Sequence, residues 1–433
     1  MKIGIIGTGY VGLVSAAGLA ELGHDVTGTD VDPTKIEMAS KGIPHIYEPG
    51  LEELLKSNLA KGNLRFNLDL EQTVKDSDVL FVCVNTPPKE DGSADMSYVE
   101  SVSRTIAKNM NKYKLIVEKS TVPVRTSAWI KRTISLYKKG TADFEVASNP
   151  EFLREGAAVD DFLHPDRIIV GVESDRARDI MSKIYEKYKD LILFTNIDTA
   201  ELIKHASNSF LATKISFINL MANICEETDA DVGLVAKGMG LDTRIGEQFL
   251  KAGLGYGGSC FPKDVRALIR IGEDLGLNFD LLKKVDRINT DRIDLFVEKI
   301  RKALWILKDK KIAVLGLAFK PETDDLRNAP SIPVIKRLQA EGAVLSLYDP
   351  KAMDNMKAIL PESDQISYAV SAMEALQDTN AALIITEWDE IKNIDLGEAK
   401  DRMLNPILID GRNCIQPDEA KRLGFEYYSF GRK

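Results

Sequence analysis

The feature that most constrains the fold is a glycine-rich hexapeptide near the start of the chain, Gly7-Thr8-Gly9-Tyr10-Val11-Gly12. It follows an apolar run typical of a buried strand, Lys2–Ile6, and it precedes an apolar helical run. In such a turn Gly7 permits a sharp bend, Gly9 lets the backbone approach a pyrophosphate, and Gly12 lets the helix pack closely on the strand. The order of strand, turn and helix predicts a Rossmann-like lobe that binds a dinucleotide at the helix N-terminus.

A carboxylate at the end of the second predicted strand indicates which dinucleotide binds. Asp30 follows the run Asp25–Thr29 and lies about 20 residues beyond the glycines, where a carboxylate accepts hydrogen bonds from the ribose hydroxyls. The same charge would repel the 2′-phosphate of NADP, so we predict NAD as the cofactor. Lys35 is close enough in sequence to weaken this preference; alternatively, it is an exposed helix residue.

Further apolar runs in residues 1–197 alternate with helical sequence and predict a mostly parallel sheet. They are apolar runs and not alternating ones, as expected of strands covered on both faces. These runs are Val79–Val84, Leu115–Glu118, Glu145–Ala147 and Arg167–Val170. Several end in polar or Gly/Pro loops, namely Asn85-Thr86-Pro87, Ser120-Thr121 and Asn149-Pro150. Because ligands of open α/β sheets bind at the carboxyl ends of the strands, we expect these loops to line the site.

The character of the sequence changes at residue 198, where Asp198 and Glu201 have the spacing of a helix capping box. Helical patterns then predict an all-helical central domain over residues 198–308. A second α/β lobe, residues 309–433, begins with Lys311–Leu315 and Gly316, which repeats the opening pattern without a second GxGxxG. The predicted fold is therefore α/β, with two Rossmann-like parallel-sheet domains joined by a central all-helical domain.

The composition narrows the possible classes of function. The 433 residues carry a formal net charge of −9, which argues against a nucleic-acid-binding protein. The four cysteines are scattered without a CxxC pair, so we predict neither a disulfide framework nor a metal site. Free thiols fit a reducing compartment, the cytoplasm, and no apolar run has the length of a membrane span.

One of these cysteines, Cys260, lies in a loop suited to a reactive thiol. The loop reads Gly-Tyr-Gly-Gly-Ser-Cys-Phe-Pro-Lys-Asp and runs from residue 255 to 264. It places the thiol at the start of a predicted helix, where the helix terminus and Lys263 would both lower its pKa. Asp264 follows one helical turn later. The alternative is that Cys260 is an inert, buried apolar residue.

Two further groups of residues are candidates for the chemistry. Lys204 and Asn208 are four residues apart on a predicted helix, so they share one face of it. A lysine beside an amide can bind an oxygen that becomes negative as hydride leaves or as a thiol adds; alternatively, the lysine is an exposed helix residue. Glu151 and Glu155 lie just past a predicted strand and are candidate bases, or else they form the charged first turn of a helix.

Taken together, these segments resemble the UDP-glucose/GDP-mannose dehydrogenase family over essentially the whole chain. The resemblance rests on ordered motifs at Gly7–Gly12, Val84–Pro87, Ser120–Arg125, Asn149–Gly156, Lys204–Asn208, Gly253–Asp264, Gly316–Pro321 and Thr323–Arg327. Within the family, Asp161–Arg167 is more similar to the branch acting on UDP-glucose than to the GDP-mannose or UDP-N-acetylmannosamine branches.

The resemblance implies an NAD-dependent, four-electron oxidation of UDP-glucose to UDP-glucuronate through a thiohemiacetal and a thioester on Cys260. In that scheme Lys204 and Asn208 stabilise the oxyanion. Asp264 manages protons with Thr121 and a water, and Glu151 is the base in thioester hydrolysis. The covalent step explains why the reaction needs a cysteine.

The resemblance also implies which residues contact each ligand, and it implies a homodimer. The NAD contacts would come from Gly7, Gly9, Tyr10, Val11, Gly12, Asp30, Lys35, Thr86, Thr121, Glu155, Lys263 and Arg327. The UDP-sugar contacts would come from Glu151, Phe152, Leu153, Arg154, Glu155, Lys204, Asn208, Phe249, Leu250, Lys251, Ala252, Gly253, Gly257 and Lys320. Arg244 would reach into the site of the neighbouring subunit.

Three other functions remain as alternatives. The same chemistry could act on another nucleotide sugar, a UDP-N-acetylhexosamine or GDP-mannose. A two-electron hydroxyacid dehydrogenase could share the first lobe and a Lys-x-x-x-Asn helix, but it would need neither Cys260 nor a second lobe. A non-catalytic NAD-binding regulator would leave Cys260, Lys204, Asn208 and Asp264 without a role.

Overall fold

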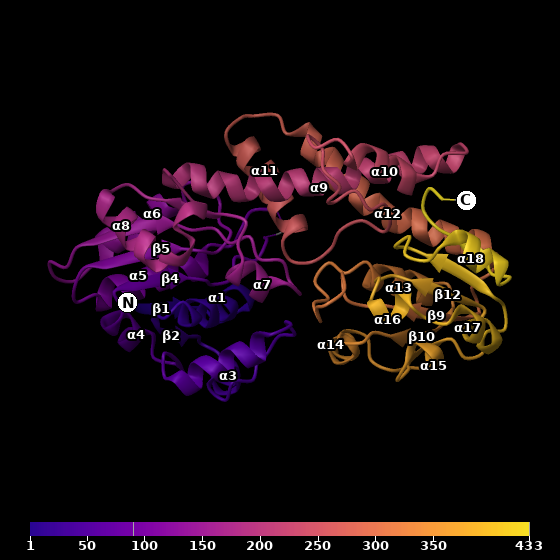
Figure 1. Ribbon diagram of the computed structural model, residues 1–433, viewed down its shortest axis with the longest axis horizontal. Helices are drawn as coiled ribbons and strands as arrows, with labels where there is room; N and C mark the ends of the chain where they lie inside the picture. Colours follow the sequence, from indigo (N-terminus) through magenta and orange to yellow (C-terminus); the bar gives the residue numbers. More distant parts are fainter. Residues whose placement is uncertain (90, 433) are drawn as a thin grey trace. The chain divides into compact units, whose positions relative to one another are not determined.

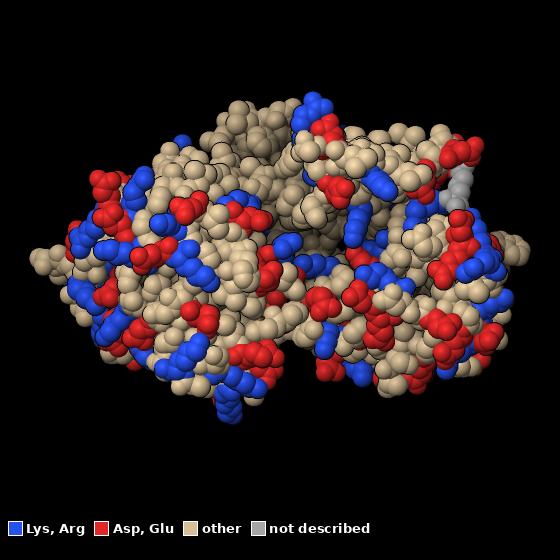
Figure 2. All heavy atoms as spheres, in the orientation of Figure 1, with Lys and Arg blue, Asp and Glu red and all other residues tan. Residues whose placement is uncertain are grey.

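The computed structural model describes residues 1–89 and 91–432. The chain forms two compact units, each built on one β-sheet: Met1–Ser207 with Arg270–Gly276, and Asn208–Ile269 with Leu277–Lys433. On the face shown in Figure 2, acidic and basic side chains are interspersed over both units. Among the described residues, no helix has the length and hydropathy that crossing a membrane requires.

The first unit contains an eight-stranded sheet in the order β3-β2-β1-β4-β5-β6-β7-β8. Its strands are β1 (Lys2–Ile6), β2 (Asp25–Thr29), β3 (Leu64–Asn67), β4 (Val79–Val82), β5 (Lys114–Glu118), β6 (Phe144–Ser148), β7 (Ile168–Gly171) and β8 (Ile192–Thr195). The first six strands pair in parallel in the Rossmann order, and β7 meets β6 in antiparallel at a single residue pair. The predicted mostly parallel sheet is confirmed.

Helices cover both faces of this sheet (Figure 1), because the strand side chains are apolar on both sides. One apolar cluster joins the sheet to α1 (Tyr10–Glu21), α3 (Leu51–Lys61), α7 (Ala158–Leu163) and α8 (Asp175–Ile184). The other joins it to α4 (Leu70–Asp76), α5 (Ser97–Asn109) and α6 (Thr126–Tyr137). The unit also contains α2 (Pro33–Ser40) and the 3₁₀ helix η1 (Glu186–Leu191).

The second unit contains a six-stranded sheet in the order β11-β10-β9-β12-β13-β14, in which every pairing is parallel. Its strands are β9 (Lys311–Leu315), β10 (Val344–Tyr348), β11 (Ile366–Tyr368), β12 (Ala381–Ile384), β13 (Ile407–Asp410) and β14 (Glu426–Tyr428). Its helices include α13 (Ser331–Ala340), α14 (Met353–Ile359), α15 (Ala372–Ala375), α16 (Asp389–Lys392), α17 (Leu396–Arg402) and α18 (Pro417–Arg422). Counted along the chain, its strands have the same order as β1–β6, which confirms the predicted second Rossmann-like lobe.

The central part of the chain is helical, as predicted. It consists of α9 (Ile197–Glu227), α10 (Val232–Gly240), α11 (Phe261–Asp274) and α12 (Asp280–Leu304). Helices α9 and α11 each contribute residues to both units. The predicted domain boundaries at 197/198 and 308/309 differ from this division into two units, and they remain a prediction.

The predicted capping box at the start of α9 is wrong. The cap is Asn196, whose Oδ1 accepts a hydrogen bond of 2.8 Å from the backbone N–H of Thr199. Glu201 is buried and instead accepts hydrogen bonds from the N–H of Arg125, at 2.6 Å, and from the N–H and hydroxyl of Ser127, at 3.0 and 2.7 Å. Tertiary contacts to the N-terminus of α6 therefore determine the orientation of this carboxylate.

Candidate active site

The glycine-rich loop has the geometry that a pyrophosphate-binding turn requires. A Cβ on Gly12 would lie 1.8 Å from the carbonyl oxygen of Gly7, so helix α1 packs on β1 only because Gly12 is glycine. Gly7 has a φ of +91°, which favours glycine. A Cβ on Gly9 would have its nearest neighbour, the Asn85 Oδ1, 3.7 Å away. Since no described side chain caps α1, the N–H groups of its first turn fit the phosphates of a dinucleotide.

Asp30 lies beside this loop at the carboxyl end of β2. Its Oδ2 accepts hydrogen bonds from the N–H of Thr8, at 2.7 Å, and from the Thr8 hydroxyl, at 3.1 Å. Burial alone would raise the pKa of Asp30, but the hydrogen bonds from the N–H groups of Thr8 and Asp32 outweigh it and hold the pKa below its ordinary value. Lys35, in the first turn of α2, also favours the charged carboxylate. Asp30 is therefore ionised at the edge of the loop, where the sequence predicted a ribose ligand.

Replacing Asp30 with alanine should raise the KM for NAD by about tenfold or more, because hydrogen bonds to a charged group contribute about 1.5–3 kcal/mol each. It should also narrow the enzyme's preference for NAD over NADP. Steady-state kinetics with both nucleotides measure the effect. The matched control is Asp32→Ala, which removes a nearby carboxylate that caps α2 through Thr34. If Asp30→Ala keeps both its KM for NAD and its discrimination against NADP, the ribose assignment is wrong.

The second lobe also has a glycine after its first strand and an aspartate after its second, but this aspartate has different surroundings. Gly316 follows β9 with a φ of +88°, and the N–H groups of Leu317 and Ala318 donate to the Oδ2 of Asp349, at 2.6 and 3.0 Å. Asp349 follows β10 as Asp30 follows β2, but it is 1% exposed, and the Nε1 of Trp388 also donates to its Oδ2. This carboxylate is thus enclosed by protein donors, which agrees with the prediction that the second lobe binds a different ligand.

Loops at the carboxyl ends of β4, β5 and β6 lie beside one another because these strands are parallel neighbours. The hydroxyl of Thr86, after β4, donates to the carbonyl oxygen of Thr121, after β5, at 3.0 Å. The hydroxyl of Ser120 donates to the carbonyl oxygen of Val84 at 2.9 Å. The structure therefore brings Thr86 and Thr121 together at the edge where the glycine loop lies, as the sequence predicted.

Glu151 and Lys204, predicted separately as a base and an oxyanion ligand, form a buried ion pair. The Lys204 Nζ lies 3.0 Å from the Glu151 Oε1, and each side chain is 5% exposed. The other carboxylate oxygen of Glu151 accepts a hydrogen bond of 2.6 Å from the N–H of Leu153. The Lys204 Nζ also lies 5.2 Å from the centre of the Phe152 ring. Glu151 and Lys204 are therefore not an exposed first turn and an exposed helix residue.

The rest of the segment 151–156 is held by neighbouring side chains. Arg154 forms an ion pair with Asp161 of α7, with an N–O distance of 2.6 Å. The guanidinium of Arg167 stacks on the Phe152 ring at 4.0 Å from its centre. Glu155 is buried. The predicted ligand residues Phe152, Leu153, Arg154 and Glu155 are thus part of one ordered segment after β6.

Sequence reasoning missed a set of buried charged groups at the end of β5. Burial raises the pKa of Glu118 to about 8 and lowers the pKa of the neighbouring Lys119. The Lys119 Nζ lies 3.2 Å from the Oδ1 of Asn149, which also accepts a hydrogen bond from the Tyr185 hydroxyl at 2.7 Å. Asn149 immediately precedes Pro150 and Glu151. Both charged residues directly precede the motif Ser120–Arg125, and nothing in that motif indicates that they are buried.

In the second unit, Cys260 is the residue from which α11 begins. Its carbonyl oxygen accepts the first helical hydrogen bond, from the N–H of Asp264, at 2.8 Å. The Sγ is 3.6 Å from the hydroxyl of Ser259. Cys260 is partly exposed, whereas Cys83 and Cys225 are buried. The predicted position of a thiol at a helix N-terminus is confirmed.

Asn208 and Asp264 meet beside this cysteine-bearing helix start. The Asn208 Nδ2 donates to the Asp264 Oδ2 at 2.6 Å, and the Lys263 Nζ lies 2.7 Å from the Asp264 Oδ1. Asp264 is fully buried. The two donors compensate the buried carboxylate, and the carboxylate fixes the amide of Asn208. The positive charge of Lys263, predicted to act on the thiol, is shared with Asp264.

The glycine-rich loop before Cys260 is held from two sides within the second unit. The Asn219 Oδ1 accepts a hydrogen bond from the N–H of Gly253 at 2.9 Å, and the buried Arg292 donates to the Gly253 carbonyl at 2.9 Å. Cβ atoms on Gly253 and Gly257 would lie 2.5 and 2.4 Å from the carbonyl oxygens of Gly411 and Asn328. The loop therefore passes too close to the second lobe for any larger residue at these positions.

The remaining predicted ligand residues of the second unit are placed as follows. Leu250 and Ala252 are buried, Lys251 is exposed, and the Phe249 ring lies 6.0 Å from that of Phe261. Arg244 is mostly exposed and pairs with Asp242.

After β9, the Lys320 Nζ lies 5.6 Å from the centre of the Phe319 ring, and Arg327 pairs with Asp325 at 2.7 Å. These distances leave the ligand roles of Arg244, Lys320 and Arg327 as predictions.

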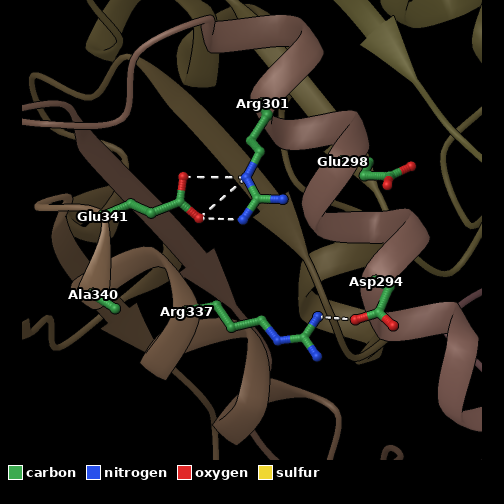
Figure 3. Close-up of a pocket in the computed structure, with 6 residues that line it drawn as sticks. All are labelled: Asp294, Glu298, Arg301, Arg337, Ala340 and Glu341. Atoms are coloured by element: carbon green, nitrogen blue, oxygen red, sulfur yellow. Dashed lines mark hydrogen bonds and ion pairs between the residues drawn. The ribbon is translucent and has the colours of Figure 1, made fainter.

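A pocket of about 530 Å³ in the second unit is lined by none of the predicted site residues. Figure 3 shows Arg301 of α12 reaching Glu341, and Arg337 of α13 reaching Asp294. Both guanidinium groups are neutralised by carboxylates across the pocket. The two ion pairs tie α12 to α13, and the chemistry of the pocket indicates no ligand.

A Rossmann lobe with this glycine loop and this ionised aspartate defines an NAD-dependent dehydrogenase. Three domain models of one family match in order: the NAD binding domain at residues 1–189, the central domain at 198–291 and the UDP binding domain at 313–417. The chain belongs to the UDP-glucose/GDP-mannose dehydrogenase family, which confirms the resemblance and the prediction of NAD as the cofactor.

Relatives are similar over their full length. The chain is 46% identical to UDP-glucose 6-dehydrogenase YwqF of Bacillus subtilis, covering 100% of this chain and 98% of that protein, and 45% identical to the UDP-glucose 6-dehydrogenase of Rhizobium meliloti, covering 100% of both. Among solved structures, a UDP-glucose dehydrogenase from Pyrobaculum islandicum has a TM-score of 0.93 at 39% identity, covering 100% of this chain and 98% of that one. A UDP-D-ManNAc dehydrogenase from Pyrococcus horikoshii has a TM-score of 0.88 at 29% identity, covering 100% and 99%.

Proposed function

We propose that this enzyme oxidises UDP-glucose to UDP-glucuronate with NAD, through a thioester on Cys260. The observation that carries the proposal is a partly exposed thiol at the start of α11, one turn before the Asp264–Asn208 hydrogen bond. The full-length relatives at 43–46% identity that are named UDP-glucose 6-dehydrogenase support the choice of sugar.

The reaction removes two hydrides and adds one water. Two NAD molecules, bound one after the other at the cofactor site, would supply one hydride acceptor for each of the two oxidations. In the first, the primary alcohol loses a hydride and a proton and becomes an aldehyde. The Cys260 sulfur then adds to the aldehyde carbon to give a thiohemiacetal, and a second loss of hydride and proton gives the thioester. Water finally cleaves the carbon–sulfur bond, which releases the acid and restores the thiol.

The residues of the chain hold charge and protons during these steps. We assign Lys204 and Asn208 to the oxygen that becomes negative, since each is a fixed donor in a buried setting. Asp264, with Thr121 and a water, accepts the protons. Glu151 is the base that activates water for thioester hydrolysis. In the absence of substrate, the pairing of Lys204 with Glu151 keeps both buried charges compensated.

The assignments of ligand contacts, domains, partner and compartment are part of the same proposal. Three domains, 1–197, 198–308 and 309–433, would bind NAD, carry the chemistry and bind the UDP moiety. A second copy of the chain would cover apolar residues of α9 that recur every seven residues and so share a face: Phe210, Phe217 and Ile224, each 45–65% exposed. Four free thiols fit the cytoplasm.

The stoichiometry of the reaction tests the function directly. Purified enzyme given a limiting amount of UDP-glucose and excess NAD should form two NADH and one UDP-glucuronate per sugar, as measured by absorbance and chromatography. One NADH per sugar would indicate a two-electron dehydrogenase, and none would indicate a binding protein. Measuring kcat/KM for UDP-glucose, UDP-N-acetylhexosamines and GDP-mannose identifies the preferred sugar. A higher kcat/KM for one of the others would show that UDP-glucose is not the substrate.

A further inference from the structure

The loop between α2 and α3 contains a buried carboxylate that has no part in the chemistry described above. Glu48 is 5% exposed and lies two residues before Gly50, from which α3 begins. Its Oε1 accepts a hydrogen bond of 2.7 Å from the N–H of Ala158, and its Oε2 accepts one of 2.7 Å from the N–H of Gly156. The Tyr10 hydroxyl donates to the same Oε2. Burying a carboxylate is costly unless several donors compensate it, and Glu48 has three.

These three donors come from two functional segments. Tyr10 belongs to the glycine-rich cofactor loop and is the first residue of α1. Gly156 ends the segment 151–156, and Ala158 begins α7. The Tyr10 hydroxyl also accepts a hydrogen bond of 3.0 Å from the N–H of Gly156, so the cofactor loop, Glu48 and the segment form one connected cluster.

The segment between Glu151 and Gly156 is held by hydrogen bonds within itself and to α7. Glu151 is bonded to the N–H of Leu153, and Arg154 is bonded through both its backbone and its guanidinium to Asp161. A second connection runs through packing: a Cβ on Gly18 of α1 would lie 2.2 Å from the ring of Phe162 in α7. Helix α1 therefore contacts the end of the segment through Tyr10, and it contacts α7, which follows the segment, through Gly18.

We propose that Glu48 is a positioning residue that couples the NAD site to the sugar-contact segment 151–156, through the hydroxyl of Tyr10 and the N–H of Gly156. The inference rests on the proposed function for the identity of the sugar and on the family for NAD. When NAD seats against the cofactor loop, the position of Tyr10 becomes fixed, and Glu48 fixes Gly156. The segment that contains Glu151, Phe152 and Leu153 is then held in one position, so the affinity for each ligand rises when the other is bound.

A purely structural role for Glu48 gives a different expectation. If Glu48 only caps α7, its loss would lower the thermal stability without changing how one ligand affects the other. The coupling between the two ligands is therefore the informative quantity. Tyr10→Phe removes a single hydroxyl and leaves the bonds from Glu48 to Gly156 and Ala158 in place. Glu48→Gln keeps the size of the side chain but places an N–H group where one backbone donor needs an acceptor.

Calorimetry measures this coupling with the full-length enzyme. UDP-glucose is titrated alone and at saturating NADH, a pair that cannot react, and the ratio of the two Kd values is the coupling factor. In the wild type we expect NADH to tighten UDP-glucose binding by about 5–150-fold, the usual range for coupled sites. In Tyr10→Phe and Glu48→Gln the factor should fall to about 1, the value for uncoupled sites. Glu37→Gln, an exposed carboxylate on α2 paired only with Lys41, should keep the wild-type factor.

A wild-type factor of about 1 overturns the inference, and so does a Tyr10→Phe variant with the wild-type factor. Amide hydrogen exchange adds a readout that does not depend on the sugar. NADH should slow exchange at Gly156 and Ala158 in the wild type but not in Tyr10→Phe. If the wild type binds NADH and not UDP-glucose, the proposed function is wrong. The role of Glu48 is excluded separately if NADH slows amide exchange in Tyr10→Phe as much as in the wild type.

Discussion

Replacing Cys260 with alanine should abolish the formation of UDP-glucuronate while leaving NAD binding unchanged. Without the sulfur, no thiohemiacetal forms, so the second hydride cannot be lost by way of a thioester. Cys260 belongs to the second unit, whereas the glycine loop and Asp30 belong to the first. Product analysis by chromatography measures the acid, and calorimetry with NAD shows that the cofactor site is intact.

A serine at the same position should give a distinct result. Its hydroxyl is poorly ionised near neutral pH, and an oxygen ester hydrolyses more slowly than a thioester, so turnover should nearly stop and an enzyme-bound ester should accumulate. Mass spectrometry of the intact protein detects that adduct. The matched control is Cys225→Ala, which removes a buried thiol from α9 and should keep activity. A folded, NAD-binding Cys260→Ala variant that makes UDP-glucuronate at a comparable rate would refute the covalent mechanism.

Replacing Lys204 with methionine should lower kcat by about 10²–10³-fold, the usual effect of removing one donor to a developing oxyanion. The substitution should also destabilise the first unit, because it leaves the carboxylate of Glu151 buried without its cation. Breaking a buried ion pair by removing one partner costs about 3–5 kcal/mol. Steady-state kinetics and denaturant unfolding measure the two effects separately.

A double variant separates catalysis from stability at this position. Lys204→Met combined with Glu151→Gln removes both buried charges, so it should recover most of the lost stability and none of the lost activity. The control is Lys214→Met. Lys214 lies farther along α9 and donates a hydrogen bond to a loop carbonyl, so its replacement should leave kcat unchanged. Near-normal kcat in the single Lys204→Met variant would mean that this lysine serves only to compensate Glu151.

The parts of the fold that the sequence predicts are those with a strong local signal. Strands β1, β4 and β5 each contain an apolar run that is buried on both faces, and each lies within two residues of its predicted bounds. Strands β3, β8, β11 and β14 are short and partly exposed, and they lie at or near the edges of the sheets. Strands β3, β11 and β14 have a mixed composition that resembles that of loops, and β8 is a mostly apolar run of only four residues, so pairing with a neighbouring strand identifies them.

The same distinction applies to the candidate site. Cys260 and Asp264 are one helical turn apart, so the motif alone places the thiol at a helix start with a carboxylate beside it. The pairing of Glu151 with Lys204 joins residues far apart in the sequence, and neither motif predicts the partner of the other. Glu201 shows the converse error, since its spacing to Asp198 predicted a local cap but its contacts are with the N-terminus of α6. The spacing of residues in the sequence predicts which side chains are neighbours on one helix. It does not predict contacts between separate elements, which depend on how those elements pack.

The division of the chain into two interlaced units has a consequence for biosynthesis. The first unit includes Arg270–Gly276, which the ribosome synthesises only after more than half of the central helical region. Domains usually fold in order as they emerge during translation, at about 5–20 residues per second. Here the N-terminal unit cannot complete its packing when residue 207 emerges; it must wait for the end of α11. Nascent chains of this protein therefore pass through a stage in which a nearly finished NAD lobe still lacks one of its own segments.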